Sequence, residues 1–158
     1  MDLGLLTLGD HLTDPVTGAR QTQAERHRGL VEQAVVAERS GFTSVHLGEH
    51  HFCDYILSAP PIMLAAIGER TSTLRLSTGV TLGANIDPVR LAEDYATVDL
   101  LSGGRVEPVL GRGTFFPHTF RAFGQDPTLA KPVFAEHVEL RVGIAEAHHR
   151  ERVDDNVL

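Results

Sequence analysis

Short apolar runs alternate with longer amphipathic stretches along most of this chain, and this alternation constrains the fold more than any other feature. Four apolar runs are predicted strands: residues 3–8, 43–47, 74–82 and 106–110. The predicted helices lie at about residues 22–41, 58–70, 87–104 and 132–148. Strand–helix units of about 30 to 40 residues are typical of a parallel sheet with right-handed crossovers. We therefore expect an α/β fold of about four βα units, with residues 3–8 as a buried strand.

The helix boundaries carry local signals. Thr22 and Glu25 have capping-box spacing, and Gly41 is placed to end the first helix. Pro60–Pro61 fits the first turn of the second helix, because proline is tolerated there. The third helix is expected to begin at Asp87–Pro88 and end at Gly103–Gly104, with an inward face of Leu91, Ala92, Tyr95, Val98 and Leu101. The fourth strand runs into Gly111–Arg112–Gly113, and a long loop rich in phenylalanine is expected to follow before the last helix.

Candidate ligand residues follow the second, third and fourth strands rather than the first. Gly9–Asp10–His11 lacks the glycine-rich phosphate loop of a doubly wound sheet. The spread is instead typical of the carboxyl-terminal face of a (β/α)₈ TIM barrel. Such barrels have about 250 residues, and this chain has 158. We therefore expect a partial TIM barrel, whose two unpaired strand edges must be covered by oligomerisation, favouring a homo-oligomer.

Composition limits the partners and the compartment. The formal net charge of −7 argues against nucleic acid as the main partner. Neither a membrane-length apolar run nor a signal peptide is evident, and the single cysteine, Cys53, excludes an intrachain disulfide. A cytoplasmic protein without membrane association is expected. No metal site is expected, because His50 and His51 are neighbours that point to opposite sides of an extended segment.

The segment Gly48–Phe52 directly follows the second strand and carries the clearest chemical signal. His50 can exchange protons near neutral pH, and Glu49 can orient an imidazole. The alternative is that His50 and His51 cap the strand end or support an interface, which remains the favoured role for His51. Arg112 between two glycines suits a phosphate, since glycine lets the backbone approach closely, but it also suits a carboxylate partner. Three aromatic residues fit either a substrate pocket or the core equally well: Phe115, Phe116 and Phe120.

An ordered set of motifs across residues 2–140 resembles the bacterial luciferase-like family of flavin-dependent monooxygenases. The set runs through Gly41–Phe42, Glu49–Phe52, Ala65–Ile67, Arg70–Thr71, Leu76–Val80, Asp87–Arg90, Ala92–Asp94, Asp99–Arg105, Gly111–Gly113, Phe120 and Phe123–Gly124. The resemblance implies a TIM barrel that binds reduced FMN at its carboxyl-terminal end. There the flavin would react with O₂ to form a C4a-peroxide that oxygenates a small organic substrate. The Glu-His-His-Phe segment favours FMN over a deazaflavin.

The resemblance also implies roles for particular residues. His50, with Glu49, matches the catalytic histidine near flavin and substrate. Gly79–Val80 matches a non-prolyl cis peptide that supports the isoalloxazine ring. Arg112, with Gly113 beside it, and Lys131 match contacts to the FMN phosphate. A separate flavin reductase is an implied partner.

The resemblance fades after Leu140. We expect residues 1–140 to be the amino-terminal half of a luciferase-like barrel and residues 141–158 to be an atypical polar tail. Two functions remain open on the sequence. The chain is either an FMN-dependent monooxygenase, or a truncated, inactive half-barrel that serves only as a weak flavin-binding or assembly module.

Overall fold

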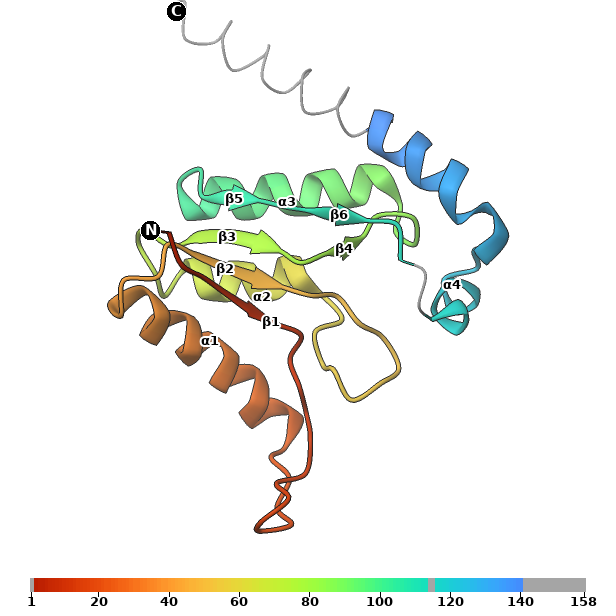
Figure 1. The fold of residues 1–158 in the computed structure, drawn as a ribbon. Coiled ribbons are helices and arrows are strands. Elements are labelled where there is room, and N and C mark those ends of the chain that lie inside the picture. Colours follow the sequence, from red (N-terminus) through yellow and green to blue (C-terminus); the bar gives the residue numbers. More distant parts are fainter. Residues whose placement is uncertain (1, 114–115, 141–158) are drawn as a thin grey trace, which may run out of the picture. The chain divides into compact units, whose positions relative to one another are not determined.

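A computed structural model describes residues 2–113 and 116–140 (Figure 1). The expected polar tail, the end of the last helix and Phe115 lie outside these residues. The chain forms two compact units. The first comprises Met1–Thr81 with Thr97–Leu110, and the second comprises Leu82–Ala96 with the chain from Gly111 onward.

The first unit is built on a four-stranded parallel sheet, which confirms the predicted α/β fold with parallel strands. Its strands are β1 (Gly4–Thr7), β2 (Ser44–Leu47), β3 (Arg75–Thr78) and β5 (Val106–Glu107). They lie in the order β1-β2-β3-β5, so sequential strands are neighbours (Figure 1). Each pair is parallel; the register aligns Leu5 with Val45, Val45 with Leu76, and Leu76 with Val106. Every carboxyl end in the sheet therefore faces the same way.

Alternation along the strands divides their side chains between two faces of the sheet. The row of Leu5, Val45 and Leu76 includes two of the most buried core side chains, with Val45 at 1% and Leu76 at 0% exposure. Successive strand residues point to opposite faces, so Leu6, His46 and Ser77 form a row on the other face. Val45 and Leu76 belong to the core between the sheet and its helices, and α2 packs against β3.

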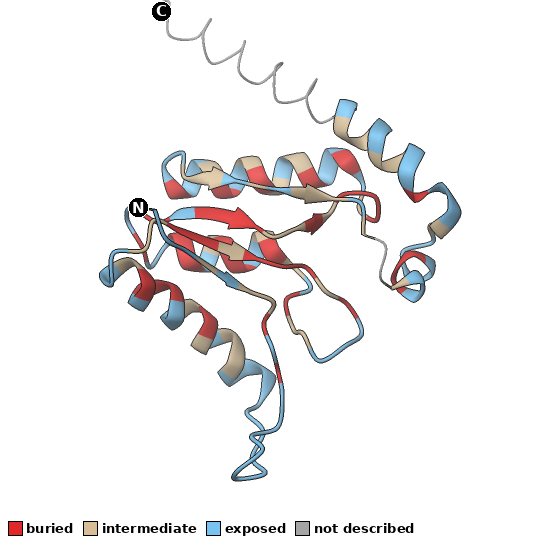
Figure 2. Cartoon of the chain, viewed as in Figure 1, coloured by how far each residue is buried: buried red, intermediate tan, exposed pale blue. Residues whose placement is uncertain are grey.

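The prediction of a buried first strand is wrong. The residues of β1 are exposed or half-buried, and Leu6 is 60% exposed (Figure 2). The reason is topological, because β1 lies at the edge of the sheet and has only β2 beside it. An apolar run predicts a strand, but the burial of that strand depends on whether it has a neighbouring strand on each side.

The third and fourth predicted strands are each divided in two. Residues 74–82 form β3 and β4 (Thr81–Leu82), interrupted at Gly79–Val80. Residues 106–111 form β5 and β6 (Leu110–Gly111). Where the backbone ladder stops, the buried hydroxyl of Thr78 donates to the carbonyl of Val109 at 2.7 Å and accepts from its amide at 2.9 Å. The Thr78 side chain thus pairs with the Val109 amide, while the Val109 carbonyl also accepts from the Thr81 amide at 2.9 Å.

Helices α1 (Gln23–Arg39) and α2 (Pro60–Gly68) start where the sequence predicts. The predicted capping box of α1 is confirmed, since Thr22 accepts from the Glu25 amide and Glu25 accepts from the Thr22 amide. Gly41 follows the helix with a φ of 85°, the left-handed conformation that glycine adopts most easily. Both first-turn prolines of α2 are also confirmed.

The capping box gives a direct test of how α1 begins. Replacing Thr22 with alanine should lower the free energy of unfolding by about 1 kcal/mol, because one helix-end amide loses its acceptor. Serine at this position retains the hydroxyl and should stay close to the wild type. Urea denaturation of the three proteins measures the difference, and equal midpoints for Thr22→Ala and the wild type would contradict the assigned cap.

Helix α3 (Pro88–Ser102) begins after Asp87, whose carboxylate accepts from the Arg90 amide at 2.9 Å. Leu91, Tyr95 and Val98 are buried as predicted, at 1%, 3% and 4% exposure. Leu101 is 60% exposed, so its predicted inward orientation is wrong. The buried stripe continues to Ser102 instead, because the helical period places residue 102, not 101, in line with residues 91, 95 and 98.

The described part of the second unit has a small core of Ala84, Phe120 and Ala130, against which Val133 and Phe134 pack. The expected phenylalanine-rich loop contains two elements that the sequence analysis missed: α4 (Pro117–Ala122) and the 3₁₀ helix η1 (Pro127–Leu129). Residues 130–140 are helical, in line with the predicted last helix. Phe120 is therefore a core residue, because it is 3% exposed within this cluster.

Candidate active site

The Glu-His-His segment lies at the carboxyl end of β2, and the carboxylate of Glu49 pairs with the His51 imidazole. His51 Nε2 lies 2.8 Å from Glu49 Oε1, with side-chain exposures of 9% and 0%. Glu49 and His51 are two residues apart on an extended segment, so they point to the same side. The Glu49 carboxylate therefore contacts the imidazole of His51, and its catalytic role stays a prediction. The same contact leaves His51 buried and paired, as is common for structural residues.

His50 has a different environment from His51. Its amide donates to the Leu57 carbonyl at 2.9 Å, and its ring centroid lies 4.8 Å from that of Tyr55 at an angle of 45°. Burial lowers the pKa of His50 below its ordinary value, and the neighbouring His51 lowers the pKa further. The Glu49 charge opposes both effects by raising the pKa. His50 is therefore mainly neutral at pH 7 and available to accept a proton.

The titration of His50 tests this environment. We expect its NMR titration to have a midpoint below 6.5, the ordinary pKa. The unfolded chain then binds a proton at higher pH than the folded chain. The folded state is therefore at its most stable, as far as His50 is concerned, above pH 6.5. Its free energy of unfolding falls as pH drops from 6.5 through the lowered pKa of His50. A midpoint above 6.5 would mean that the Glu49 charge outweighs burial.

The second candidate element, Gly79–Val80, lies directly after β3 and contains a cis peptide bond. The resemblance implied this cis bond at this position, and the structure confirms it. The Glu49 amide donates to the Val80 carbonyl at 3.0 Å, and the Gly79 amide donates to the Leu47 carbonyl at 2.9 Å. The two candidate elements are thus joined by backbone hydrogen bonds where β2 and β3 end.

Gly48 allows this close approach. A Cβ at residue 48 would collide with the Leu8 side chain and lie 3.0 Å from the Gly79 carbonyl oxygen. The Leu8 side chain can move, but the Gly79 carbonyl is backbone next to the cis bond. Glycine is therefore required for the segment after β2 to lie against the segment after β3.

The remaining candidate residues lie in the second unit. Arg112 and Gly113 directly follow β6, and the Gly83 amide donates to the Gly111 carbonyl at 2.9 Å. Gly113 has a φ of 70°, and a Cβ there would lie 3.0 Å from the Leu82 side chain. Arg112 and Lys131 both have exposed side chains, so each cation can reach a ligand from solvent.

Two residues that the sequence analysis did not single out have notable environments. Tyr55 stacks near His50, and Asn85 is 3% exposed. Neither polar atom of the Asn85 side chain has a hydrogen-bond partner among the described residues. Buried amides in proteins are normally paired, often by ordered water, so Asn85 marks a place where a further polar group is needed. Asparagine shortly before Asp87–Pro88 is an ordinary turn residue, so its buried environment could not be predicted from the pattern.

Comparison with known proteins places this parallel α/β fold in a family. A profile of the family described as "Luciferase-like monooxygenase" matches residues 1–154. The oxygenase component of a flavin-dependent trigonelline monooxygenase from Acinetobacter baylyi is 29% identical over 97 residues, which cover 61% of this chain and 27% of that protein. The chain therefore belongs to the luciferase-like monooxygenase family, whose members include flavin-dependent monooxygenases.

Solved structures agree with this assignment. The monooxygenase RslO1 from Streptomyces bottropensis superposes with a TM-score of 0.78 at 30% identity, covering 89% of this chain and 42% of that one. A 3,6-diketocamphane monooxygenase from Pseudomonas putida, solved with FMN, superposes with a TM-score of 0.79 over 91% of this chain and 39% of that one. Its identity is 17%, so it supports the fold alone. The chain spans well under half the length of the curated relatives it matches, with 35%, 37% and 27% for three of them. It accordingly has part of their TIM-barrel fold.

Within the described residues, every helix falls short of the length and apolarity that a bilayer crossing requires.

Proposed function

We propose that this chain carries the FMN-binding, proton-handling half of a luciferase-like monooxygenase. Reduced FMN supplies the electrons that activate O₂, so that one oxygen atom enters a small organic substrate and the other leaves as water. The observation that carries the proposal is the hydrogen bond from the Glu49 amide to the Val80 carbonyl. It brings the segment bearing His50 to the cis peptide at the adjoining strand end.

The residues present fit a flavin mononucleotide in chemical type. The Gly79–Val80 peptide lies next to the Glu-His-His segment, to which its Val80 carbonyl is hydrogen-bonded, and backbone at this place would contact the flavin ring. Arg112 and Lys131 offer exposed cations for a phosphate, and Gly113 has no side chain to hinder its approach. In this proposal Glu49 acts through His51, which fixes the backbone on both sides of His50.

His50 is the proposed acid–base residue. Its lowered pKa leaves a neutral imidazole at pH 7, which can take a proton from substrate and return it. Proton control matters at a reduced flavin, because a misplaced proton releases hydrogen peroxide rather than oxygenated product. The rate at which peroxide is released in the absence of substrate therefore reports on His50.

Binding of reduced FMN tests the proposal. Anaerobic calorimetry with the purified 158-residue chain should show saturable binding of reduced FMN at micromolar concentrations. His50→Ala should bind the flavin like the wild type, but on admission of O₂ without substrate it should release hydrogen peroxide faster. Absence of binding at micromolar concentration would favour the second function, an inert assembly module that lacks the flavin chemistry.

We propose that a separate flavin reductase supplies the reduced FMN, as the name "oxygenase component" implies for the Acinetobacter relative.

We further propose that the chain forms a homo-oligomer. Strands β1 and β5 are the edges of the sheet, and the β1 side chain of Leu6 is 60% exposed. Light scattering should give a mass of at least two chains, and a monomer at all concentrations would refute the oligomer.

A further inference from the structure

The loop that follows β2 is attached to the loop that follows β1. The His11 amide donates to the Asp54 carbonyl at 2.8 Å, and the Ile56 amide donates to the Gly9 carbonyl at 3.0 Å. Between them Asp10 and Tyr55 form an isolated antiparallel bridge. Residues 9–11 and 54–56 therefore lie side by side as a short, two-sided attachment, which we call the loop pair.

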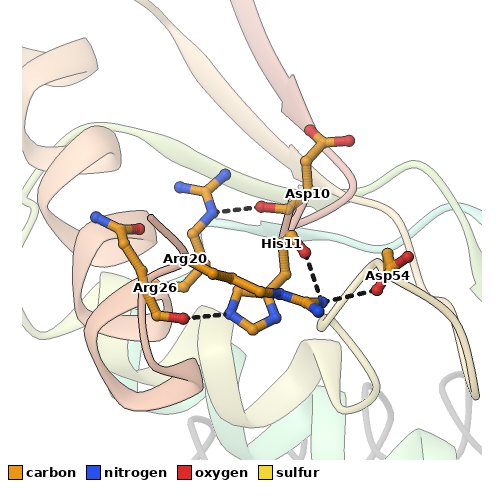
Figure 3. Close-up of polar contacts among 6 residues, drawn as sticks. Asp10, His11, Arg20, Arg26 and Asp54 are labelled. Atoms are coloured by element: carbon orange, nitrogen blue, oxygen red, sulfur yellow. Dashed lines mark hydrogen bonds and ion pairs between the residues drawn. The ribbon is translucent and has the colours of Figure 1, made fainter. Parts of the chain in front are cut away.

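Side chains at and before the start of α1 lock this loop pair (Figure 3). Arg20 donates from one terminal nitrogen to both the His11 carbonyl and Asp54 Oδ1, each at 2.7 Å. Arg26 Nε donates to the Asp10 carbonyl at 2.7 Å. The largely buried His11 ring donates from Nε2 to the Gln21 carbonyl at 2.6 Å. Arg20 thus joins the backbone of one loop to a side chain of the other.

The loop pair leads directly to His50. Tyr55, whose ring centroid lies 4.8 Å from that of His50, is the residue next to Asp54. Leu57, whose carbonyl accepts from the His50 amide, follows two residues later. The placement of Asp54 against the β1 loop thus fixes the two groups that cover and hold His50.

We propose that Arg20, with Asp54, is a positioning residue for His50. By tying residue 54 to the His11 backbone, it keeps the Tyr55 ring over the imidazole and keeps the imidazole partly out of water. Arg20 touches neither flavin nor substrate, and it acts only through the loop. This inference deepens the function proposed above, in which His50 handles protons, but its test requires no turnover.

The Arg20–Asp54 ion pair can position the loop without adding much to the free energy of unfolding. The side chains of Arg20 and Asp54 are 44% and 66% exposed, so their ion pair contributes little to folding. A second exposed pair, Arg70 with Glu32 at 2.9 Å, has similar exposures of 53% and 57%. It joins the turn after α2 to α1 and includes no residue of the loop pair. Arg70→Ala is therefore a matched control for losing one surface ion pair.

The test compares Arg20→Ala, Asp54→Ala, Asp54→Asn and Arg70→Ala by NMR titration of His50 and by amide hydrogen exchange. Both alanine variants of the loop pair should raise the pKa of His50 toward 6.5, because the loosened loop lets water reach the ring. Exchange at His11 and Ile56 should quicken about 2- to 5-fold, the range that a surface ion pair supports. Asp54→Asn retains an acceptor oxygen and should stay near the wild type, as should Arg70→Ala.

The paired design also excludes a purely electrostatic effect. Removing the Arg20 cation would raise the pKa of a nearby imidazole, whereas removing the Asp54 anion would lower it. A rise in both variants supports positioning. Opposite shifts, no shift in either variant, or an equal shift in Arg70→Ala would overturn it. If the wild type fails to bind FMN while both variants raise the His50 pKa, the proposed function fails and the positioning role stands.

Discussion

Arg105→Ala should lower the free energy of unfolding by about 3 kcal/mol, one of the two largest effects expected from a single change in this chain. The Arg105 guanidinium donates to the carbonyls of Ser102, Leu74, Gly68 and Thr71 and to the Thr71 hydroxyl, at 2.7–3.0 Å. It thereby joins the ends of α2 and α3 to the start of β3. Alanine would leave these acceptors without their donor at a half-buried site, and acceptors in such sites are costly to leave unpaired.

Two further variants show whether the hydrogen-bonding geometry or the charge is responsible. Arg105→Lys retains the charge but offers a single nitrogen instead of a planar fork, so it should recover only part of the loss. Arg75→Ala removes an exposed arginine whose contact with Glu107 is 3.7 Å, and it should change stability by less than about 1 kcal/mol. Urea denaturation gives all three values. Equal losses for Arg105→Ala and Arg75→Ala would contradict the structural role of Arg105.

Arg112→Ala should weaken binding of reduced FMN about 10- to 100-fold, because a hydrogen bond to a charged group contributes about 1.5–3 kcal/mol. The folded state should be unaffected, since the Arg112 side chain is exposed. Binding of riboflavin, which lacks the phosphate, should be the same for variant and wild type. This second comparison locates any loss at the phosphate rather than at the ring.

Arg121→Ala is the matched control for Arg112→Ala. Arg121 is an exposed arginine in the last turn of α4, within the same compact unit. Its removal should leave FMN affinity within about twofold, as expected for a cation that only contributes to the general field. Full FMN affinity in Arg112→Ala, or an equal loss in Arg121→Ala, would remove Arg112 from the proposed phosphate site.

The sequence predicted those parts of the fold that depend on local rules. The capping box of Thr22 and Glu25, the prolines of α2 and the turn at Gly41 each involve neighbouring residues, and all were confirmed. The exposure of Leu6 depends on which strands lie beside β1. An apolar pattern contains no information on that point, so this exposure was missed. The break in residues 74–82 coincides with the cis bond at Gly79–Val80, which the strand pattern alone did not indicate.

In the candidate site, too, some features were predicted from the sequence and others were not. The position of His50 after β2 and the cis bond at Gly79–Val80 were foreseen, the second through family resemblance alone. The pairing of Glu49 with His51 was not, although the two-residue spacing on an extended segment could have indicated it. The roles of Arg20 and Asp54 were out of reach, because they are 34 residues apart and meet only when the two loops are brought together by the sheet.

The most direct test of the central claim is an NMR titration of the ¹⁵N-labelled chain with FMN under anaerobic, reducing conditions. A single flavin site predicts that the amides of His50, Val80 and Gly113 shift together and follow one binding curve. Shifts confined to His50 and Val80, or to Gly113, would show that these residues do not share one flavin, and would contradict the proposed site.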